Sequence, residues 1–492
     1  MPANFAPTAI DYLRFLPEIL MIVAGTLIMV MEPLVGGNKR NVFSSVTLLG
    51  FIAALVAAVV ANDYPGLSFS NMLIVDGFAT FFRVLVIGVG IFTVLSSSQY
   101  LRREHAASAE YYALLLFSVT GQCVMATANE LIMIFIGLEI SSIATYILAG
   151  YLRDDKRNNE AALKYFLLGS FATAFLLYGI AWIYGTTGST NLGDIRNFLL
   201  TGGGARNLTL AGTAAALMFV GFAFKVSAAP FQIWAPDVYQ GAPAPVTLFM
   251  SAGPKAAAFA VFLRVFTTAF GPITNRWEPF VWSSALLTMV IGNFAALLQT
   301  NIKRLMAYSS IAHAGYVMVA IAAATPNHTQ EGVAAAMFYL AAYCFMNIGA
   351  FAVITHFSRQ GEKYVNIDDL AGLGWKQPGT AALFSIFLLS LIGVPLTGGF
   401  FGKFYIFKAA LDADLVWLSI LGLLSSAVAA YYYLRVIVVM YMHEPGESTI
   451  TLEPLSPGIR TTLWAAALGT LILGIFPSLL LNFANSSSAL VK

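Results

Sequence analysis

Four ionisable side chains lie deep inside long apolar stretches of this sequence: Glu139, Lys225, Lys255 and Lys403. On insertion scales, a charge at the centre of a bilayer opposes insertion by about 2.5–3.5 kcal/mol, so the four together oppose it by on the order of 10 kcal/mol. Apolar residues at these positions would insert more easily, and fold stability therefore does not explain the charges. A pathway for an ion does explain them.

Lysine is suited to proton transfer in an apolar environment. Burial lowers the pKa of a lysine from about 10.4 by up to several units, and a nearby carboxylate raises it again. A contact between Glu139 and a lysine that forms and breaks would therefore load and release a proton. Because a row of cations is a poor set of sodium ligands, we expect the transported ion to be the proton.

His313 lies in the polar run 308–316 (YSSIAHAGY) of another apolar segment. Histidine titrates near pH 6.5, so this side chain is a candidate relay between the lysines. The alternative is an ordinary hydrogen bond to a backbone carbonyl. The hydroxyl groups that are candidates to hold bridging waters belong to Ser170, Ser227, Tyr308, Ser309, Ser310 and Tyr316.

Each of the three lysines has a proline nearby, in the pairs Lys225 and Pro230, Pro254 and Lys255, and Pro395 and Lys403. A proline inside a helix removes the hydrogen bond to the carbonyl four residues earlier. Unpaired backbone in a bilayer is tolerated only where it lines a cavity or the protein interior. We therefore expect helix breaks at Pro230, Pro254 and Pro395 that mark water-accessible half-channels, as in ion-coupled transporters. The alternative is a simple packing kink.

Apolar helices are the elements that must position these residues. Of the 492 residues, 59% are hydrophobic and only 10% are charged, whereas soluble domains carry about 25% charged residues. A membrane span needs about 20 mostly apolar residues. The sequence therefore predicts an all-α polytopic membrane protein with fourteen apolar segments, at roughly 12–33, 41–61, 76–98, 109–127, 130–151, 160–184, 210–242, 245–270, 279–299, 302–324, 331–357, 379–411, 414–442 and 459–483.

Two of these segments, 210–242 and 379–411, are too long for one simple span and are predicted to be discontinuous. They are the seventh and the twelfth segments, so they lie five segments apart. Because five is an odd number, the second copy of a five-helix repeat would cross the membrane in the opposite direction to the first. We therefore expect one membrane domain, residues 1–492, that contains two inverted five-helix repeats. Its predicted parts are N-terminal helices at 12–127, a first repeat at 109–270, a second repeat at 279–442 and a C-terminal helix at 459–483.

The basic residues of the loops predict the orientation, because Lys and Arg concentrate on the cytoplasmic side. One set of alternate loops holds thirteen basic residues and the other holds six. The first set is therefore predicted to be cytoplasmic and both termini periplasmic. Among the basic residues inside segments, Arg83, Arg264 and Arg435 are expected to snorkel or to form structural pairs. Lys164 lies near the start of its segment, where snorkelling is the alternative to function.

Composition also excludes several functions. The net charge of +2 gives no reason to expect a nucleic-acid partner. Cys123 and Cys344 each stand alone in an apolar run and are expected to be inert thiols. The sequence has no Gly-rich dinucleotide loop, Walker motif, cysteine cluster or histidine pair spaced for haem or metal. No cofactor is therefore expected in this chain.

Several longer motifs carry a family resemblance. They are the runs 137–139 (GLE), 160–166 (EAALKYF), 221–231 (GFAFKVSAAPF), 234–239 (WAPDVY), 241–243 (GAP), 301–316 (NIKRLMAYSSIAHAGY) and 399–405 (GFFGKFY). The run 221–231 resembles the seventh-span motif of antiporter-like membrane subunits. The likeness covers about residues 12–483 and is greatest to the subunit N branch of bacterial NADH:quinone oxidoreductase, respiratory complex I.

The resemblance implies a fourteen-span fold with inverted repeats and a role for each candidate residue. Glu139 and Lys225 would couple to neighbouring subunits and Lys164 would modulate that pair. Lys255 would be the central relay, His313 a member of the connecting polar axis, and Lys403 the exit-side lysine. Family members commonly have His where this chain has Gln232, so that position cannot carry a proton here.

The resemblance also implies partners and a location. NAD, FMN, iron–sulfur clusters and quinone would belong to partner subunits, and subunits K and M would be the neighbours in the bacterial cytoplasmic (inner) membrane. Lys403 favours subunit N over subunit M, where the family usually has Glu. The length of the chain argues against subunit L.

We therefore expect a non-redox, proton-translocating subunit of NADH:quinone oxidoreductase, driven by quinone reduction in its partners. One alternative is a subunit of a cation/proton antiporter or of a membrane hydrogenase, which the genomic neighbourhood would distinguish. Another is a passive membrane scaffold, which predicts that neutralising the buried lysines leaves pumping intact. The insertion cost of the charges argues against the scaffold.

Overall fold

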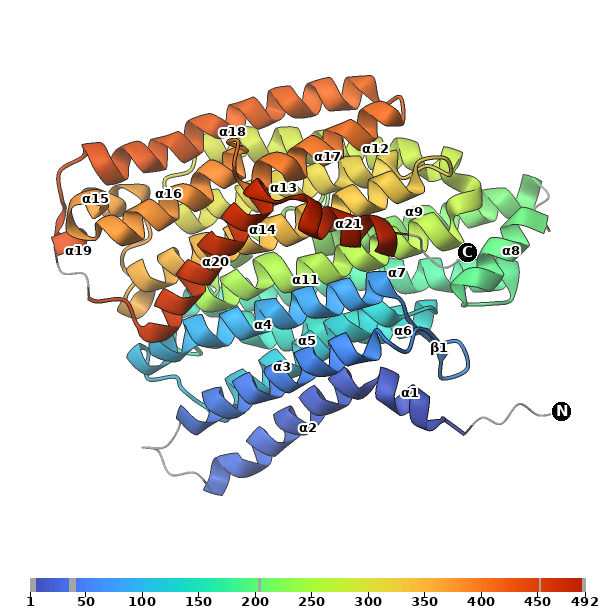
Figure 1. The fold of residues 1–492 in the computed structure, drawn as a ribbon, viewed down its shortest axis with the longest axis horizontal. Coiled ribbons are helices and arrows are strands. Elements are labelled where there is room, and N and C mark those ends of the chain that lie inside the picture. Colours follow the sequence, from blue (N-terminus) through green and yellow to red (C-terminus); the bar gives the residue numbers. More distant parts are fainter. Residues whose placement is uncertain (1–5, 35–40, 202–204, 451–452, 489–492) are drawn as a thin grey trace.

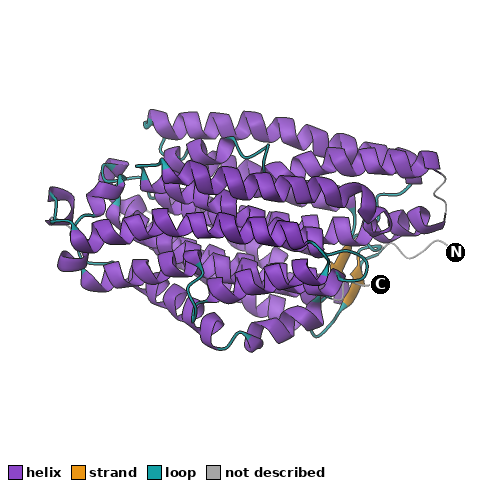
Figure 2. Ribbon diagram, turned by 90° about the horizontal axis from the view of Figure 1, so that it is seen from above, coloured by secondary structure: helices purple, strands orange, loops and turns teal. Residues whose placement is uncertain are grey.

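The computed structural model describes residues 6–34, 41–201, 205–450 and 453–488. Its helices run side by side along the long axis of the molecule, and the connecting loops gather at the two ends (Figures 1 and 2). A short antiparallel hairpin of β1 (Gly66–Ser68) and β2 (Leu73–Val75) lies at the right-hand end in Figure 1. The long helices therefore form the flanks of the bundle, and the loops and the hairpin form its two ends.

The helices of the first half are α1 (Ala9–Arg14), α2 (Leu16–Met31), α3 (Asn41–Ala61), α4 (Gly77–Arg103), α5 (Ala109–Thr127), α6 (Leu131–Ala149), α7 (Lys156–Thr187), α8 (Leu192–Thr201), α9 (Ala205–Val226), α10 (Trp234–Gly241) and α11 (Ala244–Arg264). Those of the second half are α12 (Thr274–Leu297), α13 (Ile302–Ala323), α14 (Thr329–Phe357), α15 (Leu373–Lys376), α16 (Pro378–Ile392), α17 (Gly398–Asp412), α18 (Val416–Met442), α19 (Glu447–Ile450), α20 (Pro457–Ile475) and α21 (Ser478–Ser487).

The predicted all-α polytopic membrane architecture is confirmed. In the described part of the chain, twelve helices are long and apolar enough to cross a membrane. Each apolar segment predicted from the sequence falls on one or two helices. The total of fourteen crossings and the inverted repeat stay predictions.

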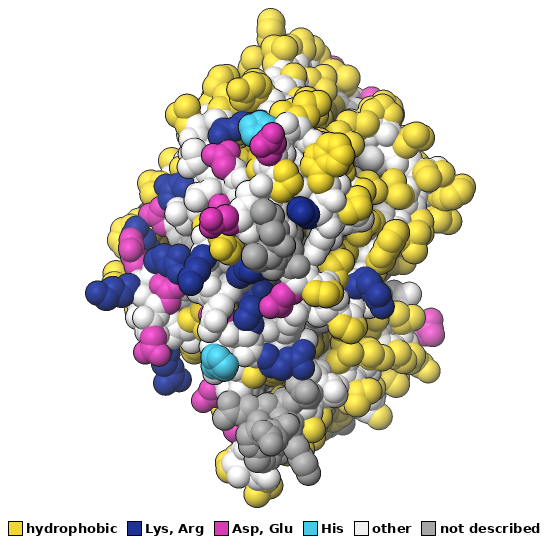
Figure 3. All heavy atoms as spheres, turned by 90° about the vertical axis from the view of Figure 1, so that its left-hand side faces the viewer, with side chains coloured by type: hydrophobic (Ala, Val, Ile, Leu, Met, Phe, Trp, Pro, Cys, Tyr) yellow, Lys and Arg dark blue, Asp and Glu magenta, His cyan; other side chains and the backbone are white. Residues whose placement is uncertain are grey.

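The surface of the bundle divides into charged and apolar regions. Figure 3 looks onto the left-hand end of Figure 1 and shows Lys, Arg, Asp and Glu gathered there, with hydrophobic side chains along the flank. Phe171, Leu424 and Leu468 are 60–68% exposed on outward faces of long helices. Large apolar patches of this kind mark contact with a membrane or a partner.

Both predicted discontinuous segments are confirmed. Residues 227–233 separate α9 from α10, and residues 393–397 separate α16 from α17. In the first break the backbone finds partners on α12. The Ala229 N–H donates to Thr288 Oγ1 (2.8 Å), and the Ser284 hydroxyl donates to the Ala229 carbonyl. Side-chain hydroxyls thus replace helical hydrogen bonds, as irregular backbone at membrane depth requires.

The helix break expected at Pro254 is wrong. α11 runs from Ala244 to Arg264 without interruption through this proline. A proline removes only one helical hydrogen bond, and 94% of the apolar window of this helix is buried inside the bundle. α4, α5 and α14 pack against α11. Neighbours on several sides therefore hold the helix together where the sequence alone predicts a break.

Candidate functional site

Lys225 lies in the last turn of α9, beside the first helix break. Its ammonium donates to Ser142 Oγ (2.7 Å) and to the Tyr146 hydroxyl (3.1 Å), both on α6. It also lies 5.1 Å from the centre of the Tyr146 ring, which adds a cation–π attraction. Glu139 lies three residues before Ser142, on the same face of α6. Its Oε1 is buried and has no hydrogen-bond partner among the described residues.

Lys255 lies in the middle of α11 and is only 3% exposed. Its ammonium donates to the side-chain oxygen (2.6 Å) and to the backbone carbonyl (3.0 Å) of Ser310 on α13. The Tyr343 hydroxyl on α14 donates to the same Ser310 side-chain oxygen (2.7 Å). Three helices therefore meet at one serine, with the lysine as the only charged member of the contact.

His313 is held between two tyrosines. Nδ1 lies 2.5 Å from the Tyr339 hydroxyl on α14, and Nε2 lies 3.2 Å from the Tyr433 hydroxyl on α18. Tyr433 also hydrogen-bonds Ser309, one turn before the histidine. Hydroxyl groups both donate and accept. The histidine therefore contacts groups that can pass a proton, and not the backbone carbonyl considered as the alternative.

Lys403 closes the end of a half-helix. Its ammonium donates to the carbonyls of Leu391 (3.0 Å) and Ile392 (2.8 Å) at the end of α16, and to Ser426 Oγ (2.7 Å) on α18. A cation is favourable at the carboxyl end of a helix, where carbonyls lack partners. The break before Pro395 and the buried lysine thus form one feature, because the lysine donates to carbonyls that the break leaves free.

Aromatic contacts join these centres into one cluster. The His313 ring lies 5.3 Å from the ring of Tyr343, which bonds Ser310, and 5.4 Å from the ring of Tyr316. The Lys403 ammonium lies 5.0 Å from the centre of that Tyr316 ring. The structure therefore brings the central lysine, the histidine and the lysine of the second break together, although they come from three different helices.

Lys164 has different partners. It lies on α7, its side chain is 40% exposed, and its ammonium is 2.7 Å from both Glu160 Oε1 and Asp237 Oδ2. Asp237 belongs to α10, the second half of the broken segment, and its Oδ1 lies 2.6 Å from Arg304 Nη1 on α13. In the described chain no ion pair or hydrogen bond joins Lys164 to the Lys225 site. Asp237 instead connects the broken segment to α7 and α13.

Other buried cations are matched with carboxylates. These ion pairs are Arg83 with Glu18 (2.8 Å), Arg264 with Asp76 (2.9 Å) and Lys303 with Glu362 (2.7 Å). Arg435 donates to the Gln299 carbonyl (3.3 Å). The structural pairing expected of Arg83 and Arg264 is confirmed. These contacts join segments that are far apart in the chain.

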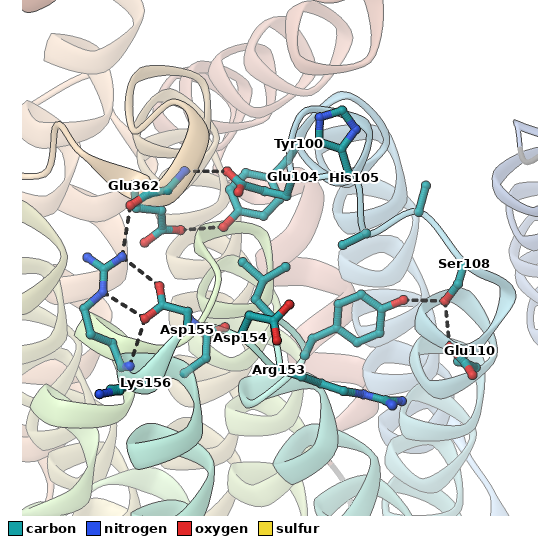
Figure 4. A pocket seen from close by; sticks show the side chains of 17 residues that line it. Tyr100, Glu104, His105, Ser108, Glu110, Arg153, Asp154, Asp155, Lys156 and Glu362 are labelled. Atoms are coloured by element: carbon teal, nitrogen blue, oxygen red, sulfur yellow. Dashed lines mark hydrogen bonds and ion pairs between the residues drawn. The ribbon is translucent and has the colours of Figure 1, made fainter.

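Glu362 also lines an open cavity at the charged end of the bundle (Figure 4). The cavity has a volume of about 920 Å³. Glu362 accepts hydrogen bonds from the Tyr100 hydroxyl (2.9 Å) and from the Ala244 N–H at the start of α11 (2.6 Å). Glu104 lies beside it in Figure 4, and burial raises the pKa of its carboxyl group. A polar recess thus reaches the buried pair of Lys303 and Glu362.

Sequence reasoning missed several of these residues. Asp237 was the clearest omission, because a carboxylate inside the segment 210–242 is itself a costly charge. The tyrosines that hydrogen-bond Lys225 and His313 were also missed, because an uncharged side chain does not stand out in an apolar run. Among the proposed hydroxyls, Ser309, Ser310 and Tyr316 belong to the cluster, whereas Ser170 is exposed.

The described residues contain no group of three or more His, Cys, Asp or Glu side chains that could hold a metal ion. Cys123 and Cys344 are both free and buried. The side chains that the described site brings together are amines, an imidazole, hydroxyls and a carboxylate, all of which can donate or accept hydrogen bonds in one of their protonation states.

Comparison with known proteins identifies the family. Residues 128–429 match the family model described as "NADH:quinone oxidoreductase/Mrp antiporter, TM". The chain is 63% identical over 492 residues to NADH-quinone oxidoreductase subunit N 1 of Solibacter usitatus (strain Ellin6076), and the alignment covers 100% of each chain. The chain belongs to the NADH-quinone oxidoreductase subunit N family. Membership confirms the resemblance found in the motifs and agrees with a multi-pass membrane protein.

Solved structures share the subunit N fold. A chain of respiratory complex I from Thermus thermophilus with bound aureothin aligns with a TM-score of 0.81 and 34% identity, and covers 96% of this chain and 100% of that chain. A chain of the membrane-bound sulfane sulfur reductase, an archaeal respiratory membrane complex, aligns with a TM-score of 0.84 and 25% identity, and covers 97% of this chain and 98% of that chain. Two different respiratory complexes thus contain this arrangement of helices.

Proposed function

We propose that this member of the subunit N family moves protons across the bacterial inner membrane as a non-redox subunit of NADH:quinone oxidoreductase. NADH oxidation and quinone reduction in partner subunits would supply the energy. One observation carries the proposal. In the described chain, the ammonium groups of Lys225, Lys255 and Lys403 contact only hydroxyls, carbonyls and aromatic rings, whereas Arg83 and Arg264 are paired with carboxylates.

The type of partner separates a transport role from a structural role. A buried cation that is fixed in an ion pair is costly to disrupt, because breaking the pair leaves an uncompensated charge. A buried ammonium that contacts only hydroxyls has no such partner to lose when its proton leaves. The hydroxyls of Ser142, Tyr146 and Ser310 can each donate or accept a hydrogen bond, so they can follow the proton in either direction.

Glu139 supplies the variable charge in this scheme. It lies on the same face of α6 as Ser142 and has a buried oxygen without a partner among the described residues. Movement of the Lys225 ammonium from the Ser142 hydroxyl toward Glu139 would form an ion pair, and the reverse movement would break it. We propose that a rearrangement of this contact couples the site to a neighbouring subunit, and that Lys255, His313 and Lys403 carry the charge onward.

The same proposal includes an orientation and partners. The charged end in Figure 3 would face the cytoplasm and both termini the periplasm, because basic loops remain on the cytoplasmic side. Subunits K and M would be the neighbours in the membrane arm. NAD, FMN, iron–sulfur clusters and quinone would be held by other subunits, since the motifs that bind such groups do not occur in this sequence.

Substitution of Lys225 by alanine in the intact enzyme tests the proposal. NADH oxidation and acidification of inverted membrane vesicles, followed by dye quenching, should both fall several-fold while a native gel shows an assembled complex. Lys376→Ala is the matched control, because Lys376 is exposed at the end of α15. Undiminished pumping by an assembled Lys225→Ala enzyme would contradict the proposal and favour the passive scaffold.

A second candidate is a subunit of another ion-translocating complex. The likeness to the sulfane sulfur reductase chain favours keeping it, because the fold alone does not determine which redox partner supplies the energy. The neighbouring genes distinguish the two candidates. If the gene for this chain lies among antiporter or hydrogenase genes, and not among NADH:quinone oxidoreductase genes, the second candidate is correct.

A further inference from the structure

A second cavity lies on the flank of the bundle, and Lys225, Lys255 and Lys403 are not among the residues that line it. It has a volume of about 650 Å³ and is lined by residues of α3 and the turn after it (55–63), α4 (80–92), α14 (341–348) and α21 (480–483). We call it the flank groove. Its lining is predominantly apolar. Ligand sites share this size and character, with a few polar groups that fix orientation.

The length of the flank groove matches one leaflet of a bilayer. Along α4 the lining extends from Thr80 to Phe92, a distance of roughly 18 Å at 1.5 Å per residue. Half of the hydrocarbon core is about 15 Å thick. Gly88 keeps the middle of the groove open, because a Cβ atom at this position would meet no heavy atom within 4 Å. The groove therefore has room for an extended alkyl chain at the depth where lipid chains lie.

The polar groups of the flank groove lie together at one end. They are Asn62, Asp63 and Thr80. α3 ends at residue 61, so Asp63 lies where a span meets the headgroup layer. Its carboxylate is exposed and makes no ion pair with any described residue. The Thr80 hydroxyl is different: the residue is only 5% exposed, and the hydroxyl has no hydrogen-bond partner in the described structure.

We propose that the flank groove binds an acyl chain of a phospholipid whose headgroup carries an amine. The apolar lining would bury the chain. Asp63 would attract the ammonium group, and the Thr80 hydroxyl would donate to an ester or phosphate oxygen, which would satisfy a buried polar group. The guanidinium of Arg14, close to the same turn, donates to the backbone carbonyls of Tyr64, Pro65 and Leu67 and forms no ion pair with Asp63. The inference is independent of proton transport.

Photo-crosslinking in the intact NADH:quinone oxidoreductase complex tests this proposal. The complex is reconstituted with phosphatidylethanolamine that carries a diazirine on its acyl chain, irradiated and digested for mass spectrometry. We expect labelled peptides from 80–92 and 341–348. Gly88→Leu should abolish the label, because leucine fills the open space while raising helix propensity. Gly185→Leu is the matched control, since Gly185 is also a helical glycine with no heavy atom within 4 Å of its Cβ position.

The headgroup is tested separately. Asp63→Asn should reduce the preference for phosphatidylethanolamine over phosphatidylglycerol by about two- to fivefold, the range expected for an exposed ion pair. Undiminished label in Gly88→Leu, or no label at 80–92 in the wild type, would overturn the site. Equal labelling by the two lipids would overturn the headgroup preference. If excess long-chain quinone displaces the label, the groove binds quinone and not a phospholipid. If crosslinks trap a neighbouring subunit in the groove, that subunit is its occupant.

Discussion

Replacement of Lys403 by methionine removes a buried charge with little change in side-chain length. In the structure this ammonium donates to the carbonyls of Leu391 and Ile392 and to the Ser426 hydroxyl. Methionine has no donor, so both carbonyls at the end of α16 lose their partner. The substitution therefore removes a structural cap and a proposed proton carrier at the same time, and the two effects need separate measurements.

The loss of the cap should cost little stability, because removal of the buried charge offsets it. Two buried carbonyls left without a partner cost about 1–3 kcal/mol each, or roughly 2–6 kcal/mol together. Removal of a charge from the bilayer interior is favourable by about 2.5–3.5 kcal/mol. The net loss of stability is therefore at most about 3.5 kcal/mol, and at the other extreme the variant gains about 1.5 kcal/mol. Even the largest loss is less than the 5–15 kcal/mol that typically separates folded from unfolded domains. We expect the Lys403→Met subunit to fold and assemble.

The functional part should be larger. In inverted vesicles, we expect proton pumping and NADH oxidation by the Lys403→Met enzyme to fall several-fold, with normal amounts of complex on a native gel. Lys408→Met on the same helix is the control. Lys408 is 58% exposed and pairs with Asp412 one turn later (2.8 Å), a surface pair worth about 0.3–0.5 kcal/mol. Its loss should leave both activities unchanged.

Lys403→Arg separates capping from proton release. Arginine keeps a positive donor near the Leu391 and Ile392 carbonyls but stays protonated at all relevant pH values. We expect this variant to assemble like the wild type and to lose pumping. Full pumping by either assembled variant would refute the relay reasoning. Absence of the subunit from the Lys403→Met complex, with full activity in Lys403→Arg, would show that Lys403 only closes the half-helix.

Two further predictions concern the other charged contacts. Asp237→Asn removes the carboxylate shared by Lys164 and Arg304. Each pair is partly exposed and worth about 0–1 kcal/mol, so the Asp237→Asn complex should assemble while its vesicle acidification decreases. Asp237→Glu keeps the carboxylate and should retain acidification. Wild-type acidification by Asp237→Asn would show that the contact only holds helices together. Arg83→Met leaves Glu18 buried without its partner, which costs about 3–5 kcal/mol. This subunit should disappear from native gels, and its normal assembly with a wild-type melting temperature would contradict a structural role for the pair.

Local patterns in the sequence predicted most of the helices. The segment 41–61 coincides with α3, and the breaks in 210–242 and 379–411 appear between α9 and α10 and between α16 and α17. These features depend on hydropathy and on proline, which act over a few neighbouring residues. Pro254 did not follow the same rule, because the surrounding helices, and not the proline alone, determine whether α11 continues.

The candidate residues were predictable by type but not by partner. A buried charge is visible in the sequence because it interrupts an apolar run, and this signal identified Glu139, Lys225 and Lys255. It does not say whether the charge is paired. Arg83 finds Glu18 at a separation of 65 residues, and no local pattern indicates such a contact.

The sequence by itself determined that this chain is a helical membrane protein of the subunit N type, because hydropathy and the long motifs are properties of adjacent residues. Only the tertiary structure decided which buried cations have carboxylate partners and which contact hydroxyls and carbonyls alone. The same holds for Asp237, which meets Lys164 from another helix. These distinctions arise from contacts between helices that are far apart in the chain, and the free energy of a buried charge depends on those contacts.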